Sequence, residues 1–298
     1  EIRLSLVGSE MCIRDSALCD DLCSLKAGCL RPVLAVKIRF NRKGQKISCH
    51  FHRAKIKVRK NFSYPQVEDI INNAVPEKLE NIDVPLLQVI RNLWHGYQLI
   101  SKNPDKAEPL HLLLPERKII FDAQGNVQDI VTEKLLQSHK LIEEVMIQAN
   151  ICAAQQLEES RKNFLYRVHP EPPKAKQEVL IRLAHMLQLP WCPQKALTPK
   201  AINQILKAAR ETELKEVVSQ FVLRAQSQAQ YQRENIGHFG LYLTHYTHFT
   251  SPIRRYADLL VHRALLEALQ LEEKAALPTS PHSLSLIHIS EPTRLRRI

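Results

Sequence analysis

The stretch HFGLYLTHYTHFTSPIRRYADLLVHRALL, residues 238–266, carries the clearest structural signal in the chain. At its centre Thr250 or Ser251 can cap the free backbone N–H groups that begin a helix. Pro252 suits the first helical position because it has no N–H to satisfy. Apolar residues then recur at helical spacing, at Ile253, Leu259, Leu260, Val261, Leu265 and Leu266. The pattern predicts a helix that starts at Pro252 and runs towards Pro278.

Arg254 and Arg255 lie within the first turn of this predicted helix. Free N–H groups and the helix dipole attract anions at a helix N-terminus, and guanidinium forks match phosphate oxygens. The two arginines therefore indicate a phosphate contact. A plainer interpretation is a solvated first turn in which Arg254 pairs with Asp258 at i,i+4. The residues by themselves leave both interpretations open.

The spaced string H-F-G-L, Y-x-H-F-T-S-P-I-R-R-Y-x-D-L and H-R resembles the signature of the ribonuclease II/ribonuclease R family, in its RNB catalytic domain. The resemblance implies a monomeric, cytoplasmic enzyme that degrades single-stranded RNA from its 3′ end to nucleoside 5′-monophosphates. It implies that Arg254 neutralises charge on the scissile phosphate. It also implies RNA contacts by Glu143, Arg255, Ser251, Thr250, Tyr231 and His111.

The same resemblance implies hydrolysis with Mg²⁺ held by clustered aspartates. The family's pattern, D-x-x-x-x-x-D-x-D-D, does not occur in this sequence. In the family it precedes the segment that resembles residues 22–25, so we expect this chain to lack the metal ligands. A downstream S1 domain, which clamps RNA in the family, is expected to be missing too. The chain by itself is therefore predicted to be nearly inactive.

Three functional hypotheses follow from these observations. The first is a central-to-C-terminal part of an RNB exoribonuclease whose complete form is active. The second is an RNA-binding pseudoenzyme that never had the aspartates. The third is a basic helical adaptor without a nucleic-acid role, which salt-independent or absent RNA binding would favour.

Composition narrows the class of protein and of partner. The chain has 298 residues, and 42 Lys+Arg against 31 Asp+Glu give a net charge of +11, which favours a polyanionic partner. The sequence contains neither a transmembrane-length apolar run nor a signal peptide. Seven cysteines without a C-x-x-C pair indicate a reducing compartment. The spacing of Cys19, Cys23 and Cys29 favours free thiols over zinc ligands.

The two ends of the sequence do not resemble the rest. A DNA segment that encodes residues 10–16, EMCIRDS, has a reverse complement that encodes residues 284–290, LSLIHIS. Opposite strands of one short element at both ends suggest a sequencing adapter translated by mistake. We therefore expect residues 1–16 and 284–298 to be adapter-derived, and residues 17–283 to form one partial catalytic domain.

The segment from Val33 to Phe51 predicts a β-hairpin. Val36, Ile38 and Phe40 alternate with Lys37 and Arg39, residues 41–44 have turn chemistry, and residues 47–51 alternate again. A change of parity at Ala54, Ile56 and Val58 predicts a bulge or a new strand. From residue 39 to residue 60 there are nine Lys/Arg and no carboxylate, with Phe51, His50 and His52 among them. This predicts a phosphate-tracking face with stacking rings, or else a sheet edge protected by lysines.

Helical patterns and one more hairpin complete the chain. Helices are predicted at residues 65–74, 83–101, 133–159, 177–187, 199–210 and 214–228, with a hairpin at residues 118–131. The buried side of the second helix is predicted to comprise Leu86, Leu87, Ile90, Leu93, Trp94 and Tyr97. That of the third is predicted to comprise Leu136, Leu141, Val145, Met146, Ala149, Ala153 and Leu157. The fold class is therefore α+β, with β-hairpins packed against several helices.

Overall fold

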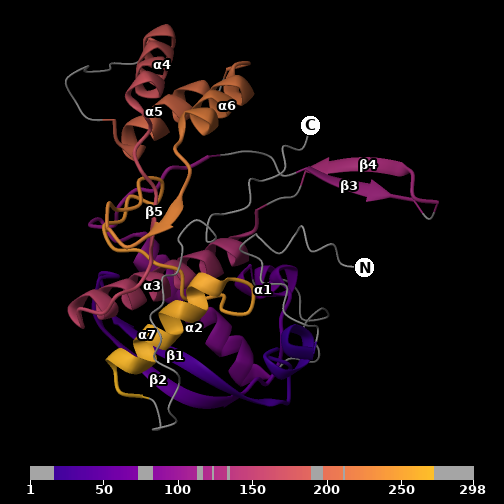
Figure 1. Cartoon of the computed structure of the whole chain (residues 1–298). Coiled ribbons are helices and arrows are strands. Elements are labelled where there is room, and N and C mark those ends of the chain that lie inside the picture. Colours follow the sequence, from indigo (N-terminus) through magenta and orange to yellow (C-terminus); the bar gives the residue numbers. More distant parts are fainter. Residues whose placement is uncertain are drawn as a thin grey trace.

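The computed structural model describes residues 17–72, 83–112, 117–122, 124–132, 135–188, 197–210 and 212–271. Helices and short antiparallel strand pairs make up this part of the chain, which confirms the α+β class (Figure 1). The predicted adapter segments, residues 1–16 and 284–298, lie outside the described residues.

The first hairpin pairs β1 (Leu30–Phe40) with β2 (Lys46–Lys57), after a short π-helical segment η2 (Ala17–Leu22). The pairing is continuous from Leu30↔Lys57 to Arg39↔Ser48 and shifts only between Arg39 and Phe40. The bulge predicted near Ala54 is therefore wrong. Ala54 and Ile56 are half-buried on the face opposite Phe51, so the parity changes because both faces carry apolar residues.

Four helices lie around this hairpin and pack against one another: α1 (Tyr64–Ile71), α2 (Val84–Ser101), α3 (Gln137–Glu159) and α7 (Tyr256–Ala268) (Figure 1). Ser63 and Gln66 form a capping box at the start of α1. Asp83 is the N-cap residue of α2, as predicted, but its side chain makes no capping hydrogen bond. Although α2 and α3 are long, no helix among the described residues combines the length and apolarity needed to cross a bilayer.

The main core lies between β2, α3 and α7. Its buried members include Phe51, Cys152, Ala153, Leu157, Phe249, Val261 and Leu265. The buried stripe of α3 runs through residues 138, 141, 149, 153 and 157, so Val145 and Met146 are exposed, each at 38%. Leu93 of α2 is 42% exposed. These three burial predictions are wrong because apolar character alone does not tell which of two apolar faces finds a neighbour.

A separate helical group consists of α4 (Lys174–Met186), α5 (Pro199–Ala209) and α6 (Lys215–Ala225). These helices gather at the top of Figure 1, away from the first hairpin. Their own core contains Leu180, Ile202, Ile205, Val218 and Val222. Thr198 caps α5 through a hydrogen bond from the Ala201 N–H, and Pro199 occupies its first turn.

Two further strand pairs complete the described fold. The predicted second hairpin is confirmed as β3 (Arg117–Phe121) and β4 (Val127–Thr132), which projects sideways from the body (Figure 1). A short pair joins β5 (Tyr166–Val168) to β6 (Gln230–Gln232). Strands of three residues, such as β5 and β6, are too short to show a clear alternation in the sequence.

Two hairpin glycines provide a matched test of this packing. Gly44 and Gly125 both have φ near +80°, at 76° and 84°. A Cβ at Gly44 would collide with the backbone of Leu99 in α2, 2.6 Å from its carbonyl carbon, whereas a Cβ at Gly125 would meet nothing within 4 Å. We expect Gly125→Ala to cost about 1 kcal/mol from backbone strain alone. Gly44→Ala should cost roughly 1–3 kcal/mol more because the clash forces hairpin and helix apart.

Urea unfolding monitored by circular dichroism measures both changes. Equal losses of unfolding free energy in the two variants would contradict the packing of the first hairpin on α2.

Candidate functional site

The H-F-G-L motif folds back against the residues that follow β5. The Phe239 N–H donates to the His169 carbonyl oxygen (2.8 Å), and the Gly240 N–H donates to His169 Nδ1 (2.9 Å). His169 Nε2 then donates to the Ser227 carbonyl oxygen at 2.9 Å. A Cβ at Gly240 would lie 2.8 Å from His169 Nδ1. The motif therefore needs glycine because its backbone sits directly on the imidazole ring.

Asn150 of α3 anchors the next part of the loop. Its Nδ2 donates to the Tyr246 hydroxyl (3.1 Å), and its Oδ1 accepts the Phe249 N–H (2.9 Å). The amide is buried, so these bonds replace water that it cannot reach. Phe249 packs edge-on to Phe51 of β2, with ring centroids 5.5 Å apart, and stacks on His262 of α7. Phe249 thus ties the loop to α3 through Asn150, to β2 through Phe51 and to α7 through His262.

The helix after this loop begins later than the sequence predicts. Residues 252–254 form a turn, Arg255 is the N-cap, and α7 starts at Tyr256. Pro252 is therefore not the first helical residue, and neither Thr250 nor Ser251 caps the helix. The helix also ends at Ala268, ten residues before Pro278.

Asp258 holds the turn that precedes α7. Its carboxylate, in the first turn of α7, is fully buried and accepts the Ser251 N–H through Oδ2 at 2.7 Å. The same Oδ2 accepts a 2.9 Å hydrogen bond from Arg255 Nη2. Arg255 Nε lies 2.9 Å from Oδ1, but at an angle unsuited to a hydrogen bond. Asp258 thus fixes both the backbone at Ser251 and the side chain of Arg255.

The two adjacent arginines consequently differ. Asp258 pairs with Arg255 at i,i+3, and not with Arg254 as the plainer interpretation predicted. Arg254 is exposed, and in the part of the chain that the structure describes its guanidinium has no hydrogen-bond or ion-pair partner. Its charge is one of those that lower the pKa of His248. Arg254 is therefore the cation that this loop presents outward.

Tyr231 of β6 lies beneath the same loop. Its hydroxyl forms a 2.5 Å hydrogen bond with His248 Nδ1, and the Arg167 guanidinium carbon lies 4.7 Å from its ring centroid. The Tyr231 side chain is buried, with 6% of the residue exposed. The structure thus brings Tyr231 to the site, with its ring enclosed by protein. Its RNA contact stays a prediction.

Glu143 and Glu144 are adjacent on α3 but differ in burial. Glu144 is buried, forms an ion pair with Lys106 and accepts the Gln148 side-chain amide (3.0 Å). Glu143 is exposed. Both carboxylates raise the pKa of Tyr97, after the larger effect of burial, so Glu143 faces the end of α2. Its predicted role in RNA contact is untested.

His111 is exposed on the segment that leads away from α2. Its backbone N–H donates to Asn203 Oδ1 of α5 (2.8 Å). The preceding Leu110 N–H donates to the Gly240 carbonyl oxygen, also at 2.8 Å. The structure therefore places His111 next to the H-F-G-L motif, which the sequence separation of the two did not reveal. Base stacking by His111 stays a prediction.

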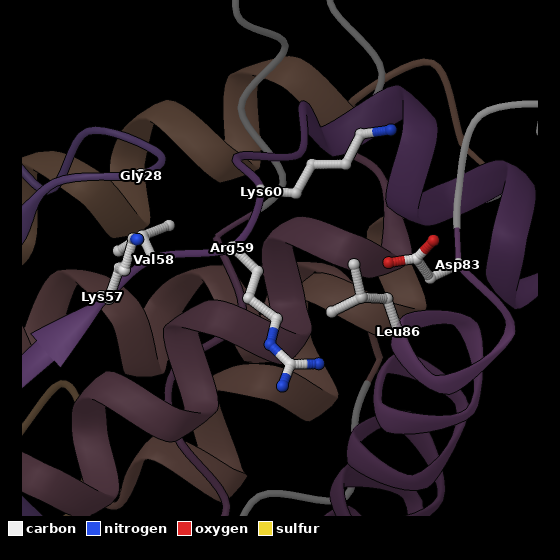
Figure 2. A pocket seen from close by; sticks show the side chains of 7 residues that line it. All are labelled: Gly28, Lys57, Val58, Arg59, Lys60, Asp83 and Leu86. Carbon is white, nitrogen blue, oxygen red and sulfur yellow. The ribbon is translucent and has the colours of Figure 1, made fainter.

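A second cationic feature lies where β2 ends. A pocket of about 530 Å³ is lined by Gly28, Lys57, Val58, Arg59, Lys60, Asp83 and Leu86. Figure 2 shows Arg59 and Lys60 extending to opposite sides, with the Asp83 carboxylate and Leu86 between them. The lining thus carries three cations and one carboxylate, so its net positive charge suits an anion. In contrast, Phe51 points into the core, opposite His50 and His52, so the predicted face of stacking rings is wrong for Phe51.

Metal-ligand chemistry does not fit the described residues. Nowhere in the described ranges do three His, Cys, Asp or Glu side chains gather closely enough to hold a metal ion. The histidines of the signature are occupied otherwise, as His238 accepts the Leu241 N–H and His262 Nε2 contacts the Phe249 carbonyl oxygen. A two-metal site therefore cannot be built from these residues.

Three supporting residues escaped the sequence reasoning. Asn150, Arg167 and His169 hold the loop through hydrogen bonds. None of the three belongs to a recognisable sequence motif. Asn150 could have been found from its position, because it lies beside Ala149 and Ala153 on the apolar side of the helical pattern. A polar residue there needs hydrogen-bond partners inside the protein.

Buried histidines make the stability of this loop depend on pH. Burial lowers the pKa of His169, His238, His248 and His262 below 6.5, to about 3 for His238 and about 2 for His248. Neighbouring basic groups, first His169 for His238 and first Arg255 for His248, lower these two pKa values further. The folded state thus disfavours protonation, and stability falls as pH drops below about 6.5, by up to about 1.4 kcal/mol per pH unit per histidine.

Unfolding in urea between pH 7.5 and pH 4.5 measures this slope. His248→Asn, which keeps a polar side chain beside the Tyr231 hydroxyl, should flatten it, because an asparagine does not take up a proton in this range. An unchanged slope in His248→Asn would show that His248 protonates freely in the folded protein.

Comparisons with known proteins agree with this geometry. The chain is 32% identical over 254 residues to ribonuclease R of Aquifex aeolicus, which covers 85% of this chain and 36% of that protein. It is 32% identical over 260 residues to ribonuclease R of Escherichia coli, covering 86% and 31%. The chain thus spans about a third of the length of these curated relatives.

A solved structure with a similar fold is Mycoplasma genitalium RNase R in complex with ribose methylated single-stranded RNA. Its TM-score is 0.77 at 28% identity, covering 87% of this chain and 40% of that one. The family model described as the RNB domain matches residues 15–271, which include the H-F-G-L motif, the turn at residues 252–254 and α7. This chain therefore belongs to the RNB family.

Proposed function

We propose that the protein to which this chain belongs is a 3′-to-5′ exoribonuclease that hydrolyses single-stranded RNA to nucleoside 5′-monophosphates. The observation that carries the proposal is the outward guanidinium of Arg254, held on a turn that Asp258 and Asn150 fix from within. Membership of the RNB family and the RNA bound by a structural neighbour support it. On this proposal the acting protein is a cytoplasmic monomer that takes part in RNA degradation.

The role proposed for Arg254 is electrostatic. A guanidinium carried by a fixed backbone turn can neutralise charge that develops on a scissile phosphate. Arg255, by contrast, already shares its charge with Asp258, so its contribution to RNA binding comes through the shape of the turn. Ser251 and Thr250 flank this turn and are proposed to contact the RNA backbone.

The other proposed RNA contacts lie around the loop. His111 is attached to the H-F-G-L motif through Leu110, and Tyr231 lies under the loop. Glu143 is exposed on α3, the helix that supplies Asn150. The cationic pocket at the end of β2 is proposed as a further phosphate contact, because a polyanion that follows the surface meets its three cations.

The cofactor proposed for the complete protein is Mg²⁺. When bound, it would supply an activated water and stabilise the leaving oxygen. The described residues do not offer a ligand set for it, so this chain is proposed to contribute phosphate binding and orientation.

The Arg254 proposal predicts a selective loss of RNA affinity. Arg254→Ala should leave the melting temperature unchanged, because the side chain is exposed. It should weaken binding of a single-stranded oligoribonucleotide by roughly 10- to 100-fold, the effect of one charge-assisted contact. Fluorescence anisotropy across a salt series measures the affinity and its salt slope, which should decrease by about one.

Arg210→Ala is the matched control, because Arg210 is also exposed but lies at the C-terminal end of α5, away from the loop. It should leave the affinity for RNA unchanged. Arg255→Ala should instead lower the melting temperature, because it leaves the buried Asp258 carboxylate without its cation. Wild-type affinity and salt slope in Arg254→Ala would refute the assignment.

The cofactor proposal predicts how activity divides between this chain and the complete protein. The 298-residue chain should release no nucleoside 5′-monophosphate from single-stranded RNA in Mg²⁺, whereas the complete protein should release it. Chromatography of the products measures this release. Robust release by this chain would overturn the proposal, and no release by either would favour an RNA-binding pseudoenzyme.

A further inference from the structure

The cationic pocket at the end of β2 lies where the first hairpin meets the start of α2. The Gly28 N–H donates to the Val58 carbonyl oxygen (2.8 Å), which ties the turn before β1 to the chain that leaves β2. Asp83 and Leu86, at the start of α2, form another wall, and the volume of the pocket is about 530 Å³. Binding sites for small molecules in proteins commonly measure about 300–1,000 Å³. The pocket is therefore large enough for a ligand of the size of a nucleotide.

The charges of this lining are unbalanced. Lys57 and Arg59 are exposed, and neither side chain has a hydrogen-bond or ion-pair partner within the described ranges. Lys60 adds a third cation, whereas Asp83 is the one carboxylate among the described residues of the lining. Asp21, in the segment that precedes the turn, is already engaged in two ion pairs elsewhere. Three cations against one carboxylate leave two positive charges in excess in the pocket.

We propose that this pocket binds a nucleoside 5′-monophosphate, the class of product that the proposed exoribonuclease reaction releases, so the inference rests on the proposed function. A phosphate monoester carries a charge of about −1.5 to −2 at pH 7, which matches the two positive charges in excess. A phosphodiester within RNA carries one negative charge and matches half of that excess. The guanidinium fork of Arg59 suits phosphate oxygens, and the two lysines add point charges. The pocket therefore favours a terminal phosphate over a phosphate inside a chain.

The rest of the lining selects a nucleotide over free phosphate. Figure 2 shows the Asp83 carboxylate beside the Leu86 side chain. An ionised carboxylate can only accept hydrogen bonds, so it repels phosphate and suits the ribose hydroxyls or the amino group of a base. Asp83 is available for this contact because its side chain makes no capping hydrogen bond to α2. Leu86 and Val58 supply apolar surface on which a base can lie.

Isothermal titration calorimetry of the 298-residue chain, at low ionic strength and without Mg²⁺, measures this binding directly. Adenosine 5′-monophosphate should bind saturably. Adenosine, which lacks the phosphate, and inorganic phosphate, which lacks the nucleoside, should each bind at least roughly 10-fold more weakly, because each loses one set of polar contacts. The dinucleoside phosphate ApA, whose single phosphate is a diester, should also bind more weakly than adenosine 5′-monophosphate.

Three variants locate the site. Arg59→Gln should weaken the binding of adenosine 5′-monophosphate by at least roughly 10-fold, because it removes the fork that holds the phosphate. Asp83→Asn, which keeps a residue favoured at an N-cap, should weaken the binding of the nucleotide but not that of inorganic phosphate. Lys55→Gln is the matched control, because Lys55 is an exposed cation of β2 outside the pocket lining, and it should leave the affinity unchanged.

The inference is overturned if adenosine 5′-monophosphate does not bind, or if ApA or inorganic phosphate binds as tightly. Equal losses of affinity in Arg59→Gln and Lys55→Gln would also overturn it, because the pocket would then attract anions through overall charge alone. None of these measurements involves hydrolysis. Nucleotide binding by this chain can therefore fail while the complete protein still releases nucleotides from RNA, which distinguishes failure of this inference from failure of the proposed function.

Discussion

A buried amide and a buried carboxylate fix the loop on which the candidate site is built. Asn150 satisfies the Phe249 N–H and Asp258 satisfies the Ser251 N–H, so two backbone donors on either side of Thr250 reach their acceptors inside the protein. Leaving such a donor unsatisfied in the interior costs about 1–3 kcal/mol. The loop therefore has one favourable position, and the backbone of Arg254 is held in place before any ligand binds.

The same buried carboxylate gives the adjacent residues Arg254 and Arg255 different environments. Asp258 neutralises Arg255 inside the protein, because a buried carboxylate requires a counter-charge. Arg254, one residue earlier, carries its charge to the surface. Burial also keeps the surrounding histidines neutral, so Arg254 adds its charge to a site where His248 and His238 add none. The charge that the loop presents is thus set by how deeply each side chain is buried, and not by the number of basic residues in the loop.

Much of the fold could be predicted, and the failures share a cause. Both hairpins and the main helices follow from periodicity, because alternation and helical spacing are local properties. Phe51, Val145 and Met146 were misplaced because each belongs to an element with apolar residues on more than one face. Which face is buried depends on a neighbouring element, and the sequence around one residue does not contain that neighbour.

By itself the sequence determined the α+β class, the order of the elements, the excess of positive charge and the signature that resembles the RNB family. Only the tertiary structure decided that α7 starts at Tyr256, that Asp258 pairs with Arg255, and that Asn150 and His169 support the loop. The physical reason is the same throughout. Local pattern sets backbone conformation, whereas hydrogen-bond partners and burial depend on residues about a hundred positions away, such as Asn150 and Phe249.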